Sequence, residues 1–377
     1  MPQFLPLTSL RLFFALWVLC RHWLYSYEGS GALFDIGISS IFFDRGYLGV
    51  DGFFVLSGFI LTYNYDSSSG MRRDWSEFIV ARIARIYPAY IVCLCAMAVA
   101  VVGYDWVTRS DMLGSVNYSA SRLFLELFML SAWRYAGSGG WNDVGWSVSA
   151  EWFAYVCFPI FLFAAPRFNP RRILLAAGCM FAVLAIIEVT SPDHLALSGG
   201  LARLVPEFML GVLLCRLRRV WIDYHGYRWA ALLSTVVCAV GIALHVDTLF
   251  VLGAAGMILS LSYGKDALAK ILSFRLLVFL GEISYCIYIV QRIPQYFFSF
   301  GRSRLPYVAD MPGAMQALLL LSITIAAAIL LHFTVEKPMR SWINRQFGAA
   351  HRRTQLKTSC GPADGQLKAS KPIPREL

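Results

Sequence analysis

The chain has 377 residues, of which 58% are hydrophobic and only 15% are charged. A soluble domain carries about 25% charged and about 45–50% apolar residues, so this composition excludes an ordinary soluble enzyme, a disordered chain and a nucleic-acid-binding protein. The formal net charge of +10 must be read by its position relative to a membrane before it indicates a ligand.

Apolar runs recur along almost the whole chain. A membrane-spanning helix needs about 20 mostly apolar residues, because its backbone polar groups must be satisfied within the helix. The runs that meet this requirement are 6–25, 45–65, 86–103, 146–165, 173–190, 200–216, 229–246, 248–263, 276–298 and 313–334. The first run holds Arg11, Arg21 and His22 with no small-residue cleavage site after it, which predicts a retained span rather than a signal peptide.

An eleventh run, 121–133, is short and contains Arg122 and Glu126. Lys and Arg concentrate in cytoplasmic loops, so their distribution indicates whether this run crosses the membrane. If it does not cross and the N-terminus is cytoplasmic, the cytoplasmic segments hold 22 Lys and Arg residues and the external segments hold 5. We therefore expect ten spans with both termini in the cytoplasm, and 121–133 as an interfacial helix in an outer loop.

The expected fold class is an all-α polytopic membrane protein, integral to the plasma (bacterial inner) membrane and in contact with its lipids. Its transmembrane domain is expected to cover 1–345, and 346–377 is expected to be a disordered basic cytoplasmic tail. Eight of the nine cysteines lie inside apolar runs, and none has metal-site spacing with His. We therefore expect buried structural thiols and no metal site.

The first span carries two side chains that are costly inside a bilayer. Arg11 and His22 are eleven residues apart, so they share one helix face and are separated by roughly 16 Å along the axis. Ionisable residues inside spans are functional candidates. The alternatives are that Arg11 extends to the headgroups and that His22 lies at the interface beside Trp23 and Tyr25.

A second basic pair, Arg82 and Arg85, lies where a helix enters the membrane near Pro88. Residues three apart share a helix face, so the two guanidiniums could hold phosphates together. Anchoring to lipid headgroups is the alternative interpretation.

Two carboxylates lie near or inside spans. In GYLGVDGFFVLSGF (46–59), glycines favour close helix packing and Asp51 lies close to the outer end of a span. In WSVSAEW (146–152), Glu151 lies about a turn and a half into a span. There Glu151 either meets a basic partner or takes part in proton transfer.

Six segments of this sequence, taken in order, resemble the membrane-bound acyltransferase 3 family over about residues 5 to 340. They are LTSLRLFFALWVLCRH (7–22), GYLGVDGFFVLSGFIL (46–61), ARIARIYPAY (81–90), GWSVSAEWFAYVCFP (145–159), GEISYCIYIVQRIP (281–294) and VEKP (335–338). The family's ten-span body agrees with the topology expected from the charges.

This resemblance implies transfer of an acyl group, most often acetyl, from cytoplasmic acyl-CoA to a hydroxyl of a glycan or other acceptor. The family's arginine and histidine of the first span fall on Arg11 and His22. Its paired-arginine motif falls on Arg82 and Arg85, and its carboxylate on Glu151. The substrate contacts expected within the same segments are Asp51, Trp146, Ser147 and Tyr285.

One motif departs from the family pattern. Many members read Ser-Tyr-x-x-Tyr-Leu-x-His where this chain has 284–291, ending in Gln291. An amide cannot act as an acid or base, so no proton-transfer role is expected there. The esterase-like domain fused to some members is also not visible, so the acceptor is expected to reach the membrane body itself or use a separate partner.

The function expected from these features is O-acylation of a surface polysaccharide or its lipid-linked precursor, with His22 as general base. An acyl-histidine intermediate is an open variant. We expect acyl-CoA as a donor substrate, no tightly bound cofactor and no nucleic-acid partner. The alternatives are acylation of a macrolide-like small molecule, a polysaccharide or lipid transporter without chemistry, and a non-catalytic membrane scaffold.

Overall fold

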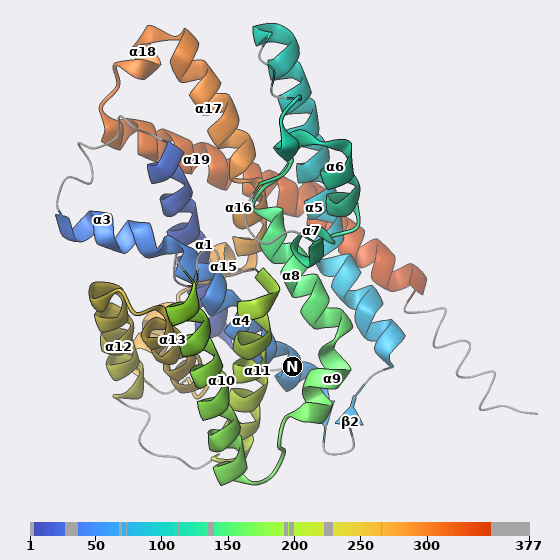
Figure 1. The fold of residues 1–377 in the computed structure, drawn as a ribbon, viewed down its shortest axis with the longest axis vertical. Helices are drawn as coiled ribbons and strands as arrows, with labels where there is room; N and C mark the ends of the chain where they lie inside the picture. The colour runs from blue at the N-terminus through green and yellow to red at the C-terminus, as the bar shows by residue number, and fades with distance from the viewer. Residues whose placement is uncertain are drawn as a thin grey trace, which may run out of the picture.

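The computed structural model describes residues 4–26, 37–67, 70–72, 74–109, 111, 113–134, 139–191, 195, 200–221, 229–264 and 266–347. Almost all of the expected tail, 346–377, lies outside these residues. The described part is helical, apart from one short antiparallel pair of strands in which Asp66 lies opposite Met71 (Figure 1).

The elements of the first half, in chain order, are α1 (Leu5–Ser26), α3 (Gly37–Asp44), the 3₁₀ turn η1 (Arg45–Tyr47), α4 (Leu48–Tyr65), β1 (Asp66–Ser67), β2 (Gly70–Met71), α5 (Trp75–Thr108), the 3₁₀ turn η2 (Val116–Tyr118), α6 (Ala120–Leu127), α7 (Ser131–Arg134), α8 (Gly145–Val156) and α9 (Phe158–Ala164).

The elements of the second half are α10 (Pro170–Thr190), α11 (Gly200–Val220), α12 (Ala230–Leu244), α13 (Asp247–Leu261), α14 (Ala267–Leu272), α15 (Arg275–Glu282), α16 (Ser284–Val290), α17 (Arg292–Arg304), α18 (Pro306–Ala309), α19 (Gly313–Leu331) and the π-helical turn η4 (His332–Glu336).

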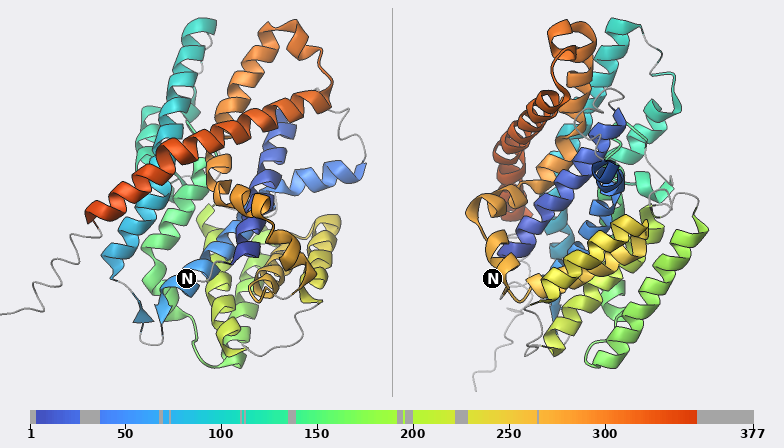
Figure 2. Two further views of the ribbon diagram at one scale, coloured as in Figure 1. Left: turned by 180° about the vertical axis from the view of Figure 1, so that it is seen from behind. Right: turned by 90° about the vertical axis from the view of Figure 1, so that its left-hand side faces the viewer.

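Helices α1 and α4 lie at the centre of the molecule, between α10–α13 on one side and α5, α8 and α19 on the other (Figures 1 and 2). Glycines allow the close packing that the sequence predicts here. A Cβ added at Gly49 of α4 would lie 2.7 Å from the Phe14 carbonyl oxygen of α1. On the other side of α4, Gly58 meets the Phe208 backbone and Gly211 of α11 meets the Val55 backbone, so neither position has room for a side chain.

The spans are less regular than the sequence predicts. Within the described residues, four helices are long and apolar enough to cross a membrane: Ile41–Tyr65, Trp75–Thr108, Pro170–Thr190 and Gly313–Phe347. A fifth is obtained if α8 and α9, which are bent by 59°, form one span. The structure therefore supports a polytopic helical protein, whereas the count of ten spans and the side of the termini stay predictions.

Local sequence explains several of these interruptions. Pro159 stands at the start of α9 and cannot donate a hydrogen bond to α8, which ends the longer helix at Val156. The expected span 276–298 is divided into α15, α16 and α17, which break at Ile283 and Gln291. Helices α12 and α13 have 15 residues each, or about 22 Å, which is shorter than a hydrocarbon core of about 30 Å.

The segment 121–133 forms two short helices instead of a span. Helix α6 has 8 residues and α7 has 4. Glu126 of α6 is buried and its carboxylate accepts hydrogen bonds from the backbone N–H groups of Trp141 and Asn142, at 2.9 and 3.0 Å. This contact fastens α6 to the residues that lead into α8, as expected for a helix within a loop.

Candidate active site

Five helices from different parts of the chain enclose a small cavity beside the beginning of α5. Its polar and aromatic lining includes Arg11 from α1, Arg82 and Arg85 from α5, Glu151 from α8 and Tyr285 from α16. Apolar residues of α4 form much of the remaining wall, and the cavity volume is about 70 Å³. The two arginines expected to bind phosphate therefore face the interior of the bundle rather than lipid.

The arginine pair is held by aromatic rings and one carboxylate. Arg82 donates a hydrogen bond to the Tyr65 hydroxyl at 2.9 Å, and its guanidinium also lies 5.8 Å from the centre of the Phe78 ring. Arg85 forms an ion pair with Glu336, which is 1% exposed. Aromatic faces attract a guanidinium without neutralising it, so Arg82 keeps its full positive charge for a ligand.

Glu336 belongs to the VEKP segment but was not expected to contact the site. It also accepts hydrogen bonds from His332 Nδ1 at 2.7 Å and from Cys286 Sγ at 3.0 Å. These three side chains form the one group within the described residues that could hold a metal ion, with ligand atoms within 4.8 Å of one another. A cation there would meet the Arg85 guanidinium, so we interpret the group as the support of Arg85.

Glu151 lines the same cavity as the arginines. Its Oε1 accepts hydrogen bonds from the Ser57 hydroxyl and from the Tyr155 hydroxyl, the latter at 2.7 Å. Of the two roles that the sequence left open, a basic partner or proton transfer, the shared cavity with three arginines favours the basic partner.

His22 lies further along α1, and its ring contacts Gln291. The two atoms, His22 Nδ1 and Gln291 Oε1, are 3.1 Å apart. Gln291 Nε2 donates to the Tyr288 carbonyl oxygen at 2.9 Å, which turns the amide oxygen toward the imidazole. A carbonyl oxygen can only accept, so this network assigns the proton to Nδ1 and leaves Nε2 as the basic nitrogen.

An ion pair lies close to the imidazole. Arg292 Nε donates to Asp143 Oδ1 at 2.7 Å, and both residues interact electrostatically with His22. Burial alone would raise the pKa of the Asp143 carboxyl, but its hydrogen bonds and charge interaction with Arg292 lower that pKa below its usual value. Asp143 and Arg292 therefore hold each other in their charged forms beside His22.

His22 is not among the residues that line the arginine cavity. The contacts that lead from the cavity wall to His22 run through two aromatic rings. Phe53 lines the cavity, and its ring centre lies 6.3 Å from that of Tyr288, whose carbonyl holds Gln291. This chain of contacts joins the cavity to the neighbourhood of His22.

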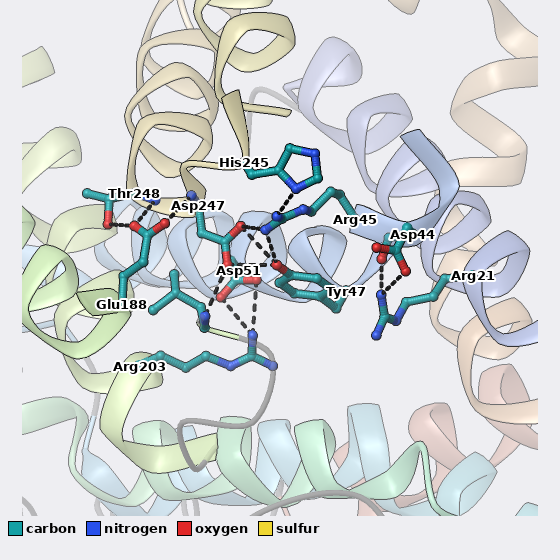
Figure 3. Close-up of polar contacts among 11 residues, drawn as sticks. Arg21, Asp44, Arg45, Tyr47, Asp51, Glu188, Arg203, His245, Asp247 and Thr248 are labelled. Carbon is teal, nitrogen blue, oxygen red and sulfur yellow. Dashed lines mark hydrogen bonds and ion pairs between the residues drawn. The ribbon is translucent and has the colours of Figure 1, made fainter. Parts of the chain in front are cut away.

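Asp51 has a partner inside the protein. Figure 3 shows its carboxylate against Arg203, whose Nη1 lies 3.1 Å from Oδ1 and 3.2 Å from Oδ2. Both side chains are buried, and the Arg203 guanidinium lies 4.9 Å from the centre of the Trp146 ring. A substrate role for Asp51 stays a prediction, and its carboxylate already has a cationic partner inside the protein.

A second ion pair beside Asp51 joins α13 to η1. Arg45 Nη1 contacts Asp247 Oδ1 at 2.7 Å, while the Tyr47 hydroxyl donates to the same carboxylate (Figure 3). Glu188 of α10 accepts hydrogen bonds from the backbone N–H groups of Asp247 and Thr248, at 2.7 and 2.9 Å. Because these groups begin α13, the network stabilises helix packing.

The other expected substrate contacts are divided between the two ends of the site. Tyr285 lies at the arginine cavity, where its hydroxyl donates to the Ile86 carbonyl oxygen at 2.7 Å. Ser147 lies nearer His22, and its hydroxyl is 2.6 Å from that of Tyr288. The Trp146 ring contacts Arg203 and also lines a second small cavity together with Asp143.

Comparison with known proteins places these features in a family. A family profile described as "Acyltransferase domain" matches residues 7–333, and the chain belongs to this acyltransferase 3 family of membrane acyltransferases. No solved structure matches the chain.

Three relatives show the range of the family. The chain is 26% identical to acyltransferase MdmB of Streptomyces mycarofaciens over 329 residues, which cover 80% of this chain and 82% of MdmB. It is 25% identical to O-acetyltransferase OatA of Staphylococcus aureus over 332 residues, 76% of this chain and 50% of OatA. YrhL of Bacillus subtilis, provisionally named a peptidoglycan O-acetyltransferase, is 26% identical over 351 residues, 83% of this chain and 54% of YrhL. The chain thus spans about half the length of the last two relatives.

Proposed function

We propose that this protein moves an acetyl group from cytoplasmic acyl-CoA to a hydroxyl of a surface polysaccharide or its lipid-linked precursor. Family membership and the names of its relatives support O-acyltransferase activity. The observation that carries the choice of donor is the cavity in which Arg11, Arg82 and Arg85 converge. Guanidiniums bind phosphate through paired charge-assisted hydrogen bonds, which suits the diphosphate of a coenzyme.

In this proposal, Arg82 and Arg85 hold the coenzyme phosphates and the pantetheine arm passes Arg11 and Glu151. Separation of the Phe53 and Tyr288 rings then admits the thioester toward His22. The roughly 16 Å between Arg11 and His22 on one helix is of the order of an extended pantetheine arm.

His22 Nε2 takes the proton from the acceptor hydroxyl as its oxygen attacks the thioester carbon. The C–S bond then breaks, and the coenzyme leaves as a thiol after receiving the proton from the imidazole. Gln291 keeps the other ring nitrogen protonated during the cycle. General base catalysis of this kind contributes about 10²- to 10⁴-fold to rate.

A glycan acceptor is the proposal that the names of the relatives favour, because YrhL is provisionally named for peptidoglycan. Mass spectrometry of the surface polysaccharide from a deletion strain tests it. Loss of O-acetyl groups, restored by the wild-type gene but not by the His22→Ala gene, is the expected result. An unchanged polysaccharide would contradict the glycan acceptor.

Two variants of the purified protein in lipid nanodiscs separate binding from chemistry. His22→Ala should lower acetyl transfer by about 10²-fold or more while leaving the Kd for acetyl-CoA unchanged. Arg82→Ala with Arg85→Ala should raise that Kd about tenfold or more, because each lost hydrogen bond to a charged group is worth about 1.5–3 kcal/mol. Full activity of His22→Ala would exclude the base role, and an unchanged Kd in the double variant would exclude the phosphate site.

A further inference from the structure

The helix that contains α19 and η4 continues to Phe347, and it ends beside the beginning of α5 (Figures 1 and 2). The ion pair between Glu336 and Arg85 joins this helix to α5. Arg340 follows Glu336 by four residues, so it lies one turn further on the same face.

Arg82 precedes Arg85 by three residues, one turn closer to the beginning of α5. The last helix and α5 run in opposite directions here. Higher residue numbers in the last helix therefore lie beside lower residue numbers in α5. One turn beyond Glu336 therefore brings Arg340 next to Arg82. Electrostatic interactions agree, because Arg340 is repelled by Arg82 and by Arg11, and Arg85 is repelled by Arg340.

Three arginines thus line the cavity, namely Arg11, Arg82 and Arg85, and Arg340 follows outside this lining. The carboxylates that accompany them are Glu336, which contacts Arg85, and Glu151 on the cavity wall. Two positive charges remain in excess within the described part of the site. Such an excess favours a ligand with several negative charges.

Arg11, Arg82 and Arg85 line the cavity together with Glu151, and Arg82 is nearer the beginning of α5 than Arg85. Arg340 is not part of this lining and is exposed, so it lies outside the cavity. In coenzyme A the 3′-phosphate of the ribose lies on the far side of the diphosphate from the pantetheine arm, so it would be the outermost phosphate of a coenzyme that enters with its thioester first.

We propose that Arg340 binds the 3′-phosphate of the acyl-CoA donor and thereby selects coenzyme A over its 3′-dephospho form. This inference rests on the proposed donor, and it assigns a separate residue to a separate phosphate. Arg340 is a specificity residue for the donor and takes no part in proton transfer.

The test compares the Kd of coenzyme A with that of 3′-dephospho-coenzyme A, measured by calorimetry on the full-length protein in phosphatidylcholine nanodiscs. The wild type should prefer coenzyme A, and Arg340→Ala should remove about tenfold or more of that preference while leaving the Kd of the dephospho form unchanged. Arg82→Ala should weaken the binding of both ligands. Arg345→Ala is the matched control, because Arg345 is an exposed arginine on the same helix whose guanidinium bonds to Ser341.

If Arg340→Ala keeps the full preference for coenzyme A, this inference is wrong while the proposed donor stands. If neither ligand binds the wild type, the proposed donor itself is wrong and the inference falls with it. Repeating the measurement in nanodiscs that contain phosphatidylglycerol tests a lipid headgroup as the anion. The inference would also be overturned if Arg340→Ala lowered the thermal stability only in phosphatidylglycerol and left the preference for coenzyme A unchanged.

Discussion

In the proposed mechanism, Gln291 prepares the base His22 without exchanging a proton itself. Its amide oxygen faces His22 Nδ1 at 3.1 Å, and its amide nitrogen is held by the Tyr288 carbonyl. The second nitrogen of the imidazole is therefore kept basic, which is the form that general base catalysis requires. In the proposed mechanism Gln291 acts through His22, which makes it a positioning residue.

Gln291→Met removes the acceptor and keeps an unbranched side chain of similar length. We expect kcat to fall about 10- to 100-fold, the usual effect of losing a group that orients a functional histidine, with the KM for acetyl-CoA unchanged. Gln295→Met is a matched control, because Gln295 donates to the His22 backbone carbonyl instead of the ring. Equal losses in both variants would indicate a general packing defect and contradict the orienting role.

At the scale of the helices, the contact between α4 and α11 forms part of the core that surrounds the site. Gly58 and Gly211 let the two backbones meet, while the opposite face of α4 lines the arginine cavity through residues such as Ser57. Movement of α4 away from α11 would therefore shift the cavity wall.

Gly211→Val should lower the free energy of unfolding by about 1–3 kcal/mol, because the added atoms overlap the Val55 backbone. Denaturant-induced unfolding in detergent measures this effect. Gly178→Val on α10 is the control, since a Cβ there has no neighbour within 4 Å and valine replaces a flexible residue. Equal stability of the two variants would contradict the close contact of α4 and α11.

At the scale of the whole molecule, the sequence predicts which charged residues belong to the candidate site better than it predicts which residues they contact. Arg82 and Arg85 share a face because they are three residues apart, and the structure brings both to the cavity of Arg11. A charged residue inside an apolar run can be recognised from the neighbouring residues alone, so the sequence is enough to identify it as a functional candidate. The family resemblance is confirmed by the match over residues 7–333.

The partners of these charges come from distant parts of the chain. Glu336 is far from Arg85 in sequence, and Gln291 is equally remote from His22. Helical periodicity describes only neighbours within a few turns, so it cannot identify such pairs. The departure of Gln291 from the family motif was visible, but its contact with the imidazole requires the packing of α1 against α16.

The interruptions of the spans show the same limit of local patterns. Residues 276–298 have the apolar character of one span but form parts of three helices. Breaks in membrane helices are tolerated where the surrounding protein satisfies the freed backbone groups. This region places Tyr285 at one end of the candidate site and Gln291 at the other, so its irregularity positions side chains of that site.

The most direct measurement is a cryo-electron microscopy structure of the protein in nanodiscs with a non-hydrolysable acetyl-CoA analogue. Our account predicts the diphosphate within about 3 Å of the Arg82 and Arg85 guanidiniums. It also predicts that the centres of the Phe53 and Tyr288 rings lie further apart than the 6.3 Å found here, with the acyl group directed toward His22. If the analogue binds elsewhere, with the arginine cavity empty and the Phe53 and Tyr288 rings still in contact, the proposed mechanism is contradicted.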